Sequence, residues 1–286
     1  MEPLYLVNLP ALMGLTSGRA EIAVGLIDGP VAIKHPDLAG ANIHTIRGTQ
    51  PGACIESTSL SCMHGTLVAG VLAARRGRSA PAICPDCTLL VRAVFAETQA
   101  RPGQVTSAVP EELAAAIVEC IEAKARIINL SVAVSQPSIS GNREIEEALN
   151  LAAKRGVIVV AAAGNQGTLA GSAITRHPWV IPVVACDLRG APLGYSNLGN
   201  SIGKRGLMAP GVGVTSLSPD GKSLLFEGTS AAAPFVTGAI ALLWSEFPNA
   251  GAGQVKFAVV GAKAARRITV VPPLLDAWEA YKVLRA

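Results

Sequence analysis

Apolar residues gather in five runs along the chain, and these runs show little polar alternation. The runs are Ile22–Ile27, Leu89–Phe95, Ile127–Val134, Val157–Ala163 and Val180–Cys186. A strand that is apolar on both faces is typical of a parallel sheet covered on both sides. The pattern therefore predicts buried parallel strands.

Segments with helical spacing of apolar residues separate these runs. Helices are predicted over Thr66–Arg75, Pro110–Lys124, Arg143–Lys154 and Ala231–Phe247. In the third segment Ile145, Leu149 and Ala152 form one stripe, and Gly156 is a typical C-terminal stop. This alternation of strands and helices predicts an α/β fold, a three-layer, doubly wound, mostly parallel sheet with helices on both faces.

Composition is consistent with one globular unit. The chain is 50% hydrophobic and 15% charged, which suits a large core and excludes a disordered chain. No repeat or low-complexity tract interrupts the pattern, so we expect a single domain over residues 1–286. No apolar run reaches the roughly 20 residues that span a bilayer, and MEPLYLVNLPALMG lacks the features of a signal peptide. We expect no membrane partner and a cytoplasmic location.

The charge pattern bears on nucleic-acid binding. The net charge is +4, and the basic residues are scattered, with small clusters at 75–78 and 266–267. Nucleic-acid surfaces need a longer basic face, and single strands are commonly stacked on interleaved aromatic side chains. We therefore expect no nucleic-acid partner.

Six cysteines fall at positions 54, 62, 84, 87, 120 and 186. Cys120 lies on a helical stripe and Cys186 ends an apolar run, so both are predicted to be small core residues. The other four lie in loop-like sequence, where 54 with 62 and 84 with 87 suit local disulfides. The redox state of these cysteines stays open.

A zinc site is the alternative use of the loop cysteines. Cys62, His64, Cys84 and Cys87 offer four zinc ligands. Their spacings match no strong zinc-finger pattern, and His64 has a better use. We therefore expect no metal.

Three residues with complementary chemistry lie at predicted strand–helix junctions, where open parallel sheets bind ligands. Asp28 ends the first strand in EIAVGLIDGPV, His64 precedes a helix in CMHGTLVAGVLAARR, and Ser230 opens an apolar helix in EGTSAAAPFVTG. Each alone has a structural explanation, as a loop cap, a helix start or an N-cap. Together they indicate a nucleophilic serine with a base and an orienting acid.

The position of Ser230 at a helix start also suits catalysis. Free N–H groups and the helix dipole stabilise negative charge there. Pro234 is predicted to lie in the first turn, where the N–H group that it lacks would have had no partner.

The sequence resembles the subtilisin-like serine peptidases over roughly Ile22 to Phe247. The resemblance rests on VGLIDGPV with HPDL after it, HGTLVAG, INLSVAV, VVAAAGNQG, YSNLGN, MAPGVGV and GTSAAAPFVTG. It implies a subtilisin-like fold with Ser230 as the nucleophile, His64 as general base and then acid, and Asp28 as the group that orients the imidazole. It also implies that Asn165 is an oxyanion donor, although an Asn after a Gly is commonly a turn former.

The resemblance further implies a peptide or protein substrate that pairs with the strand INLSVAV. The implied substrate-binding residues are Ser131, Val132, Ala133, Val134, Ala162, Ala163 and Gly164. The strand lacks the family's usual glycine after Ser131-Val132, so the shape of the subsites is not carried over. The segment RRGRSAPAICPDC lacks the acidic and amide residues of a calcium loop, so we expect no calcium and no cofactor.

One subgroup matches more closely. DGPVAIKHPDLAGANI, the cysteine before HGT and the block CPDCTLLVRAVFAE resemble proteases that mature cyanobactin-type ribosomal peptides. Macrocyclising members carry a helical insertion between the acid and the histidine, whereas a short loop is expected here, so the leader-cleaving type is predicted. No inhibitory propeptide precedes Asp28, which implies either that an upstream part was removed or that none is needed. A transpeptidase or macrocyclase, and a catalytically inactive peptide-binding module, remain as alternatives.

Overall fold

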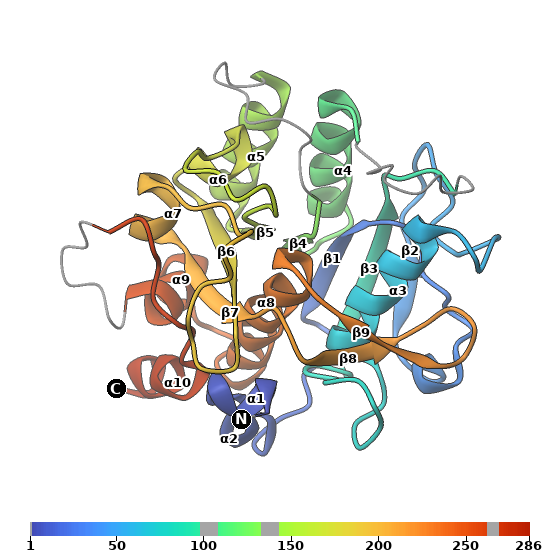
Figure 1. Ribbon diagram of the computed structural model, residues 1–286, viewed down its shortest axis with the longest axis horizontal. Helices are drawn as coiled ribbons and strands as arrows, with labels where there is room; N and C mark the ends of the chain where they lie inside the picture. The colour runs from blue at the N-terminus through green and yellow to red at the C-terminus, as the bar shows by residue number, and fades with distance from the viewer. Residues whose placement is uncertain (1, 98–107, 133–142, 262–268) are drawn as a thin grey trace.

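The computed structural model describes residues 2–97, 108–132, 143–261 and 269–286. A seven-stranded sheet in the order β2-β3-β1-β4-β5-β6-β7 lies at its centre (Figure 1). Every pair of neighbouring strands in this sheet is parallel. The strands are β1 (Ala23–Asp28), β2 (Ile43–Thr45), β3 (Thr88–Ala93), β4 (Ile127–Leu130), β5 (Ile158–Ala162), β6 (Val180–Cys186) and β7 (Leu207–Pro210).

A small antiparallel pair lies outside the main sheet. It consists of β8 (Val214–Leu217) and β9 (Ser223–Phe226), and β9 leads into the helix that carries Ser230. The sequence pattern predicted five strands of the main sheet but not β2, β7, β8 or β9. These four have three or four residues each, and none lies within a long apolar run of the kind that contains the equally short β4.

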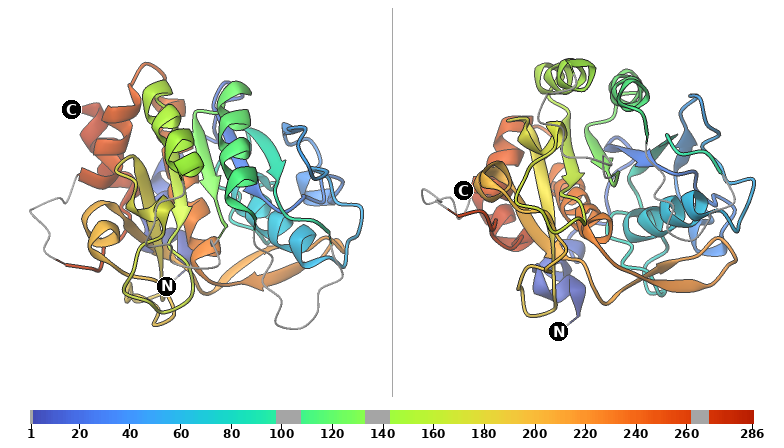
Figure 2. Two further views of the ribbon diagram at one scale, coloured as in Figure 1. Left: turned by 90° about the horizontal axis from the view of Figure 1, so that it is seen from above. Right: turned by 45° about the horizontal axis from the view of Figure 1, so that its top comes forward.

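Helices cover both faces of the main sheet (Figure 2). The helices are α1 (Pro3–Leu6), α2 (Leu9–Met13), α3 (Leu60–Ala73), α4 (Pro110–Glu122), α5 (Arg143–Arg155), α6 (Ala173–Arg176), α7 (Asn200–Arg205), α8 (Thr229–Glu246), α9 (Ala252–Gly261) and α10 (Ala277–Arg285), with a 3-10 turn η1 (Pro36–Leu38). Within the described ranges, no helix combines the length and the apolar character needed to cross a membrane.

Alternate residues of a strand point into two separate cores. Val24 and Leu26 of β1 pack in the core shared with α3 and α8, whereas Ala23 and Ile27 pack in the core shared with α4 and α5. Because both faces of each central strand are buried, the strands read as continuous apolar runs. The predicted three-layer, doubly wound α/β architecture is confirmed.

The predicted start of the helix around His64 is wrong. We expected a helix over Thr66–Arg75, but α3 begins at Leu60, so His64 lies inside it. Gly65, inside this helix, allows close packing between α3 and the segment after β1. A Cβ atom on Gly65 would lie 2.4 Å from the carbonyl oxygen of Gly29.

Candidate active site

The carboxyl ends of three neighbouring strands bring the predicted site residues to one edge of the sheet. Asp28 ends β1, Ser131 follows β4, and Asn165 lies just beyond β5. These strands are adjacent and parallel, in the order β1-β4-β5, so their carboxyl ends share an edge. Helix α8 begins at the same edge, because the N–H group of Gly164 donates to Oγ1 of Thr229 at 3.2 Å.

Asp28 and His64 form the central polar pair of this edge. Asp28 is fully buried, and its Oδ1 atom lies 2.6 Å from Nδ1 of His64. The same oxygen accepts the N–H group of Gly29 at 2.6 Å. A carboxylate at Nδ1 fixes the tautomer with hydrogen there and leaves Nε2 of the neutral ring free to accept a proton.

The surroundings of His64 decide its proton affinity. Burial by itself lowers the pKa of His64, but the charge of Asp28 and the hydrogen bond to it raise the pKa by more, so the net shift is upward from 6.5. The imidazole is 32% exposed, and its edge packs against Phe226 with ring centroids 5.6 Å apart. Phe226 is four residues before Ser230, so the imidazole lies beside the strand that leads into the helix of the serine.

Ser230 is the second residue of α8 and is nearly buried. Gly228 precedes the helix with φ 103°, a left-handed conformation that favours glycine, and a Cβ atom there would also approach Nδ2 of Asn165 to 3.1 Å. The Ser230 hydroxyl donates to the carbonyl of Ser131 at 3.1 Å. Among the described residues, no hydrogen bond joins it to His64. Catalytic hydrogen bonds of this kind are often long or unformed until substrate binds.

The predicted role of Pro234 is wrong. Because α8 begins at Thr229, Pro234 lies beyond the first turn, and the N–H group that it lacks would have bonded to the carbonyl of Ser230. Oγ of Ser131 donates to that carbonyl instead, at 3.5 Å, which is a weak bond. Pro234 therefore frees a carbonyl that the chain after β4 contacts.

Asn165 is exposed, and Thr229 fixes the orientation of its amide. Oδ1 of Asn165 accepts the N–H group of Thr229 at 2.9 Å and its hydroxyl at 3.0 Å. With the oxygen held in this way, Nδ2 points elsewhere, and no protein acceptor among the described residues bonds to it. The arrangement leaves an amide donor available beside the start of α8. The sequence interpretation missed Thr229, although the residue stands next to Ser230 in the same motif.

Asn197 holds the turn that carries Asn165, a role that the sequence interpretation also missed. Nδ2 of Asn197 donates to the carbonyl of Ala163 at 3.1 Å, and Oδ1 accepts the N–H groups of Gln166 and Thr168 at 3.0 and 3.1 Å. Its own N–H group donates to the carbonyl of Gly164 at 2.9 Å. The available signal was the asparagine in the motif YSNLGN, which the structure shows to be nearly buried.

A second buried asparagine connects the sheet to α8. Oδ1 of Asn129, in β4, accepts the hydroxyl of Thr237 at 2.7 Å, and Nδ2 donates to Oγ of Ser131 at 2.7 Å. Asn129 is fully buried, so these bonds satisfy polar groups that have no access to water. The signal was one polar residue within the apolar run of β4.

The predicted substrate-binding residues lie along the same edge. Ser131, Val132, Ala162, Ala163 and Gly164 have buried side chains or none, so any contact with a peptide would come mainly from their main chain. Ala133 and Val134 lie outside the described residues. The pairing of this segment with substrate stays a prediction.

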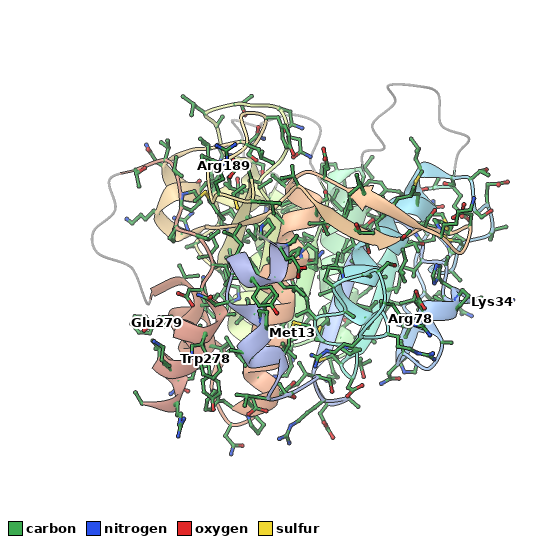
Figure 3. The ribbon with its side chains drawn as sticks, turned by 60° about the horizontal axis from the view of Figure 1, so that its bottom comes forward. Met13, Lys34, Arg78, Arg189, Trp278 and Glu279 are labelled. Atoms are coloured by element: carbon green, nitrogen blue, oxygen red, sulfur yellow. A yellow bond between two sulfur atoms is a disulfide. The ribbon has the colours of Figure 1, made fainter. Side chains whose placement is uncertain are left out.

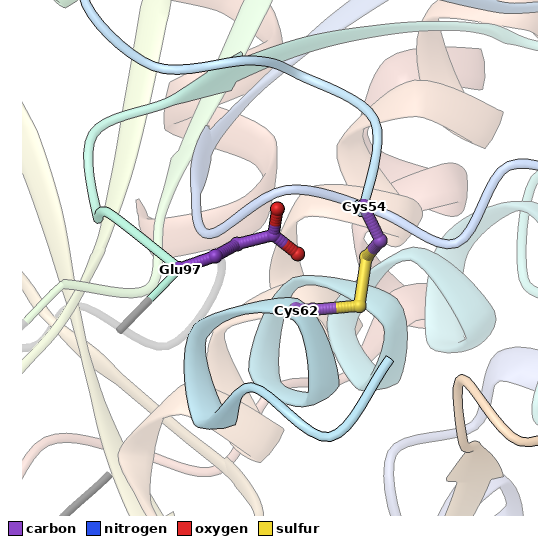
Figure 4. A group of neighbouring side chains, drawn as sticks. All are labelled: Cys54, Cys62 and Glu97. Atoms are coloured by element: carbon purple, nitrogen blue, oxygen red, sulfur yellow. A yellow bond between two sulfur atoms is a disulfide. The ribbon is translucent and has the colours of Figure 1, made fainter. Parts of the chain in front are cut away.

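The structure decides between the two cysteine interpretations. Cys54 and Cys62 form a disulfide with Cα atoms 5.5 Å apart, while Cys84 and Cys87 are free and buried. Since Cys62 is bonded to Cys54 and His64 to Asp28, the zinc set is not assembled. Among the described residues, the group with suitable spacing for a metal is Cys54, Cys62 and Glu97, in which both sulfur atoms already bond each other (Figure 4).

The two predicted core cysteines are confirmed. Cys120 and Cys186 are fully buried. Burial raises the pKa of each thiol to about 12, so both are inert thiols at neutral pH.

Comparisons with known proteins place this geometry in a family. Subtilisin DY from Bacillus licheniformis is 31% identical over 246 residues, covering 83% of this chain and 81% of that protein. Several other curated subtilisins are longer, and the chain spans 62% of their length.

Solved structures agree with the sequence relatives. The S218A mutant of the protease domain of PatA superposes with a TM-score of 0.85 at 30% identity, over 94% of this chain and 96% of that one. The prenylagaramide maturation protease PagA superposes with a TM-score of 0.83 at 26% identity, over 97% of this chain and 98% of that one. The model of the subtilase family matches residues 19–271, and the chain therefore belongs to the subtilase family of peptidases.

Proposed function

We propose that the chain is a serine endopeptidase in which Asp28, His64 and Ser230 form the catalytic triad. The observation that carries this proposal is the buried Asp28 bonded at 2.6 Å to Nδ1 of His64, at the sheet edge where Ser230 begins α8. This pairing presents Nε2 as a base and stabilises the cation that forms when Nε2 takes a proton.

The proposed steps of peptide hydrolysis follow from what the side chains of Ser230 and His64 can do. Rotation of the Ser230 side chain moves its hydroxyl from the carbonyl of Ser131 toward Nε2 of His64, which accepts the proton as Oγ attacks the peptide carbonyl. The collapsing intermediate expels the amine, which receives this proton from His64. Water then attacks the acyl-enzyme and gives a proton to His64, which passes it to Oγ of Ser230 as the bond to the acyl group breaks and the acid product leaves.

The oxyanion of each tetrahedral intermediate would be held by Nδ2 of Asn165 and the N–H group of Ser230. The carbonyl oxygen carries this negative charge only during the reaction, so donors fixed in advance favour the transition state over bound substrate. The two bonds from Thr229 supply that fixation. No cofactor takes part in the proposed reaction.

We propose a ribosomal precursor peptide as the substrate, cleaved to release its leader. The proposal is supported by the likeness to PatA and to PagA, a protein named as a maturation protease. Between Asp28 and His64 the chain forms only η1, β2 and the first turn of α3, without a helical insertion. The 32% exposed imidazole favours water as the acyl acceptor over an amine that requires a dry site. A cytoplasmic location and a single-domain organisation stay predictions.

A fluorophosphonate label tests the triad. We expect mass spectrometry to find the label on Ser230, and His64→Ala to remove it. His44→Ala is the matched control, because the His44 imidazole is exposed on β2 and bonds the side chain of Asn42, away from the triad, so labelling should persist. Equal labelling of the parent and His64→Ala would overturn the triad.

Products of a model precursor peptide in ¹⁸O-water separate the alternatives. Linear fragments with one ¹⁸O atom at the new carboxyl terminus support hydrolysis. Cyclic or ligated products without ¹⁸O would identify a transpeptidase. An unchanged peptide that still binds would identify an inactive binding module.

A further inference from the structure

The Cys54–Cys62 disulfide joins the two chain segments that present Asp28 and His64. Cys62 lies in the first turn of α3, two residues before His64. On the other side, the N–H group of Cys54 donates to the carbonyl of Val31 at 3.0 Å, and that of Val31 donates to the carbonyl of Gly52 at 3.0 Å. Val31 is three residues after Asp28, so the disulfide closes a bridge between the acid and the base.

Polar bonds also hold the first turn of α3, including one between the hydroxyls of Ser59 and Ser61 at 2.8 Å and one from the hydroxyl of Thr66 to the carbonyl of Cys62 at 2.7 Å. Ser59 occupies the N-cap position, but its side chain makes no capping bond to the helix. The main polar anchor of this turn is Ser61, whose hydroxyl donates to the carbonyl of Ala96 at 2.9 Å. The second turn is held independently, because Oγ1 of Thr66 accepts the N–H group of Ala32 at 2.9 Å. The disulfide is therefore the covalent attachment of the turn just before His64, beside these hydrogen bonds.

Glu97 fixes the loop on the Cys54 side of the bridge (Figure 4). Its carboxylate accepts the N–H group of Ile55 at 2.9 Å and that of Glu56 at 3.0 Å. Because this loop is held in place, the disulfide from Cys54 also fixes the position of the start of α3.

The bridge is accessible to thiol exchange. Cys54 is half-buried next to the exposed residues 55–58, whereas Cys62 is fully buried. Because Cys54 is the less buried partner, a thiolate from solvent would attack the Cys54 sulfur and displace Cys62 as the leaving group. The four free cysteines are all buried.

We propose that the Cys54–Cys62 disulfide is a redox-sensitive positioning element, whose reduction by a dithiol loosens the first turn of α3, disturbs the Asp28–His64 hydrogen bond and slows turnover. The inference rests on the proposed function of His64. The dithiol supplies two electrons and two protons, the S–S bond breaks to give two thiols, and the reductant closes to a cyclic disulfide. A small disulfide oxidant reverses the step.

The test compares oxidised and dithiothreitol-treated protein on one peptide. We expect kcat to fall by about tenfold on reduction, since a shift of the base by about 1 Å costs up to a hundredfold, and KM to change little. A loosened bond to Asp28 also lowers the pKa of His64, so the acidic limb of the pH profile of kcat/KM moves to lower pH. After the reductant is removed, a small disulfide oxidant should restore both kcat and the position of the acidic limb.

Two variants locate the effect. Cys54→Ser/Cys62→Ser should match the reduced protein and no longer respond to the dithiol. Cys84→Ala/Cys87→Ala, which removes the buried pair elsewhere, should respond as the parent does. If the double serine variant fails to fold, reduction of the parent still supplies the comparison, with thermal unfolding of both forms recorded.

Several outcomes would overturn the inference. These are an unchanged kcat and pH profile when two thiols per chain have been released, a redox response that is lost in Cys84→Ala/Cys87→Ala, or unfolding of the reduced protein at the assay temperature. Failure of the oxidised protein to label with fluorophosphonate is a different result, because it rejects the proposed function itself.

Discussion

At the scale of single residues, the site depends on side chains whose orientation is set by one neighbour. Thr229 bonds Oδ1 of Asn165 through both its N–H group and its hydroxyl, and this hydroxyl also accepts from Gly164. Asp28 plays the corresponding part for His64. In each pair the first group leaves a donor or acceptor of the second available for substrate.

Asn165→Ala should reduce kcat by roughly a hundredfold or more with little change in KM, a loss known for the corresponding donor in subtilisin. The side chain is exposed, but its Oδ1 atom accepts two bonds from the buried Thr229, so the free energy of unfolding should fall by about 1–3 kcal/mol. Steady-state kinetics and urea unfolding check both quantities. A rise in KM with an unchanged kcat would assign Asn165 to substrate binding.

Thr229→Val should lower kcat less, by about tenfold, because the N–H group of residue 229 still holds Asn165 while the hydroxyl bond is lost. Thr229→Ser is the matched control and keeps the hydroxyl. Equal rates for the valine and serine variants would show that the backbone bond alone orients the amide.

The dependence of kcat/KM on pH should reflect the pKa of His64 in its pair with Asp28. His64 acts as a base only when neutral, and its pKa is raised above 6.5, so kcat/KM should fall as pH drops through a midpoint above 6.5. Asp28→Asn should move this midpoint down and also lower kcat. A raised pKa also means that His64 stabilises the fold below pH 6.5 and that this contribution is lost as pH rises through the folded-state value. An unmoved midpoint in Asp28→Asn would contradict the assignment.

At the scale of elements, β4 and α8 are joined by buried polar bonds as well as by apolar packing. Thr237 of α8 donates to Asn129 of β4, and Asn129 donates to Ser131, which accepts the hydroxyl of Ser230. The position of the serine's helix on the sheet thus depends on this chain of bonds.

Thr237→Val should lower the free energy of unfolding by about 1–3 kcal/mol, because it leaves Oδ1 of Asn129 buried without a donor. Thr237→Ser keeps the hydroxyl and should cost less. Urea unfolding monitored by circular dichroism measures the difference. If the two variants unfold alike, the hydroxyl bond contributes nothing measurable and packing of the methyl group dominates.

At the scale of the whole molecule, one arginine connects the N-terminal segment to the loop after α3. The guanidinium of Arg76 donates to the carbonyls of Met13 and Thr16 on one side and of Ala82 and Ile83 on the other. These bonds lie in the segment where we predicted no calcium. Figure 3 shows the nearby Arg78 together with Lys34 at one edge of the molecule, far from Trp278 and Glu279 of α10.

Arg76→Met should lower the free energy of unfolding by about 3 kcal/mol, since four carbonyls lose a charged donor. Arg78→Met is the matched control, because Arg78 is exposed and its contact with Asp37 is long, at 3.9 Å. A calcium chelator should leave the Tm of the parent unchanged. A chelator-dependent drop in Tm would contradict the prediction for this segment.

Local pattern accounted for much of the architecture and for the candidate triad. Apolar runs located five strands of the main sheet, and Asp28 was recognised by its place at the end of a run, whereas Asn165 was implied by the family resemblance. Local pattern failed at the start of α3, which lies at Leu60 and not at Thr66, and at Pro234, which lies beyond the first turn of α8.

The sequence by itself determined the alternation of strands and helices, and hence which residues end at the functional edge of the sheet, because periodicity and burial act over a few neighbouring residues. The tertiary structure decided that Cys62 bonds Cys54 and joins no zinc site. It also decided that Thr229 orients Asn165 and that Asn129 meets Thr237. The last two pairs lie 64 and 108 positions apart in the sequence, so only the folded chain brings their atoms within bonding distance.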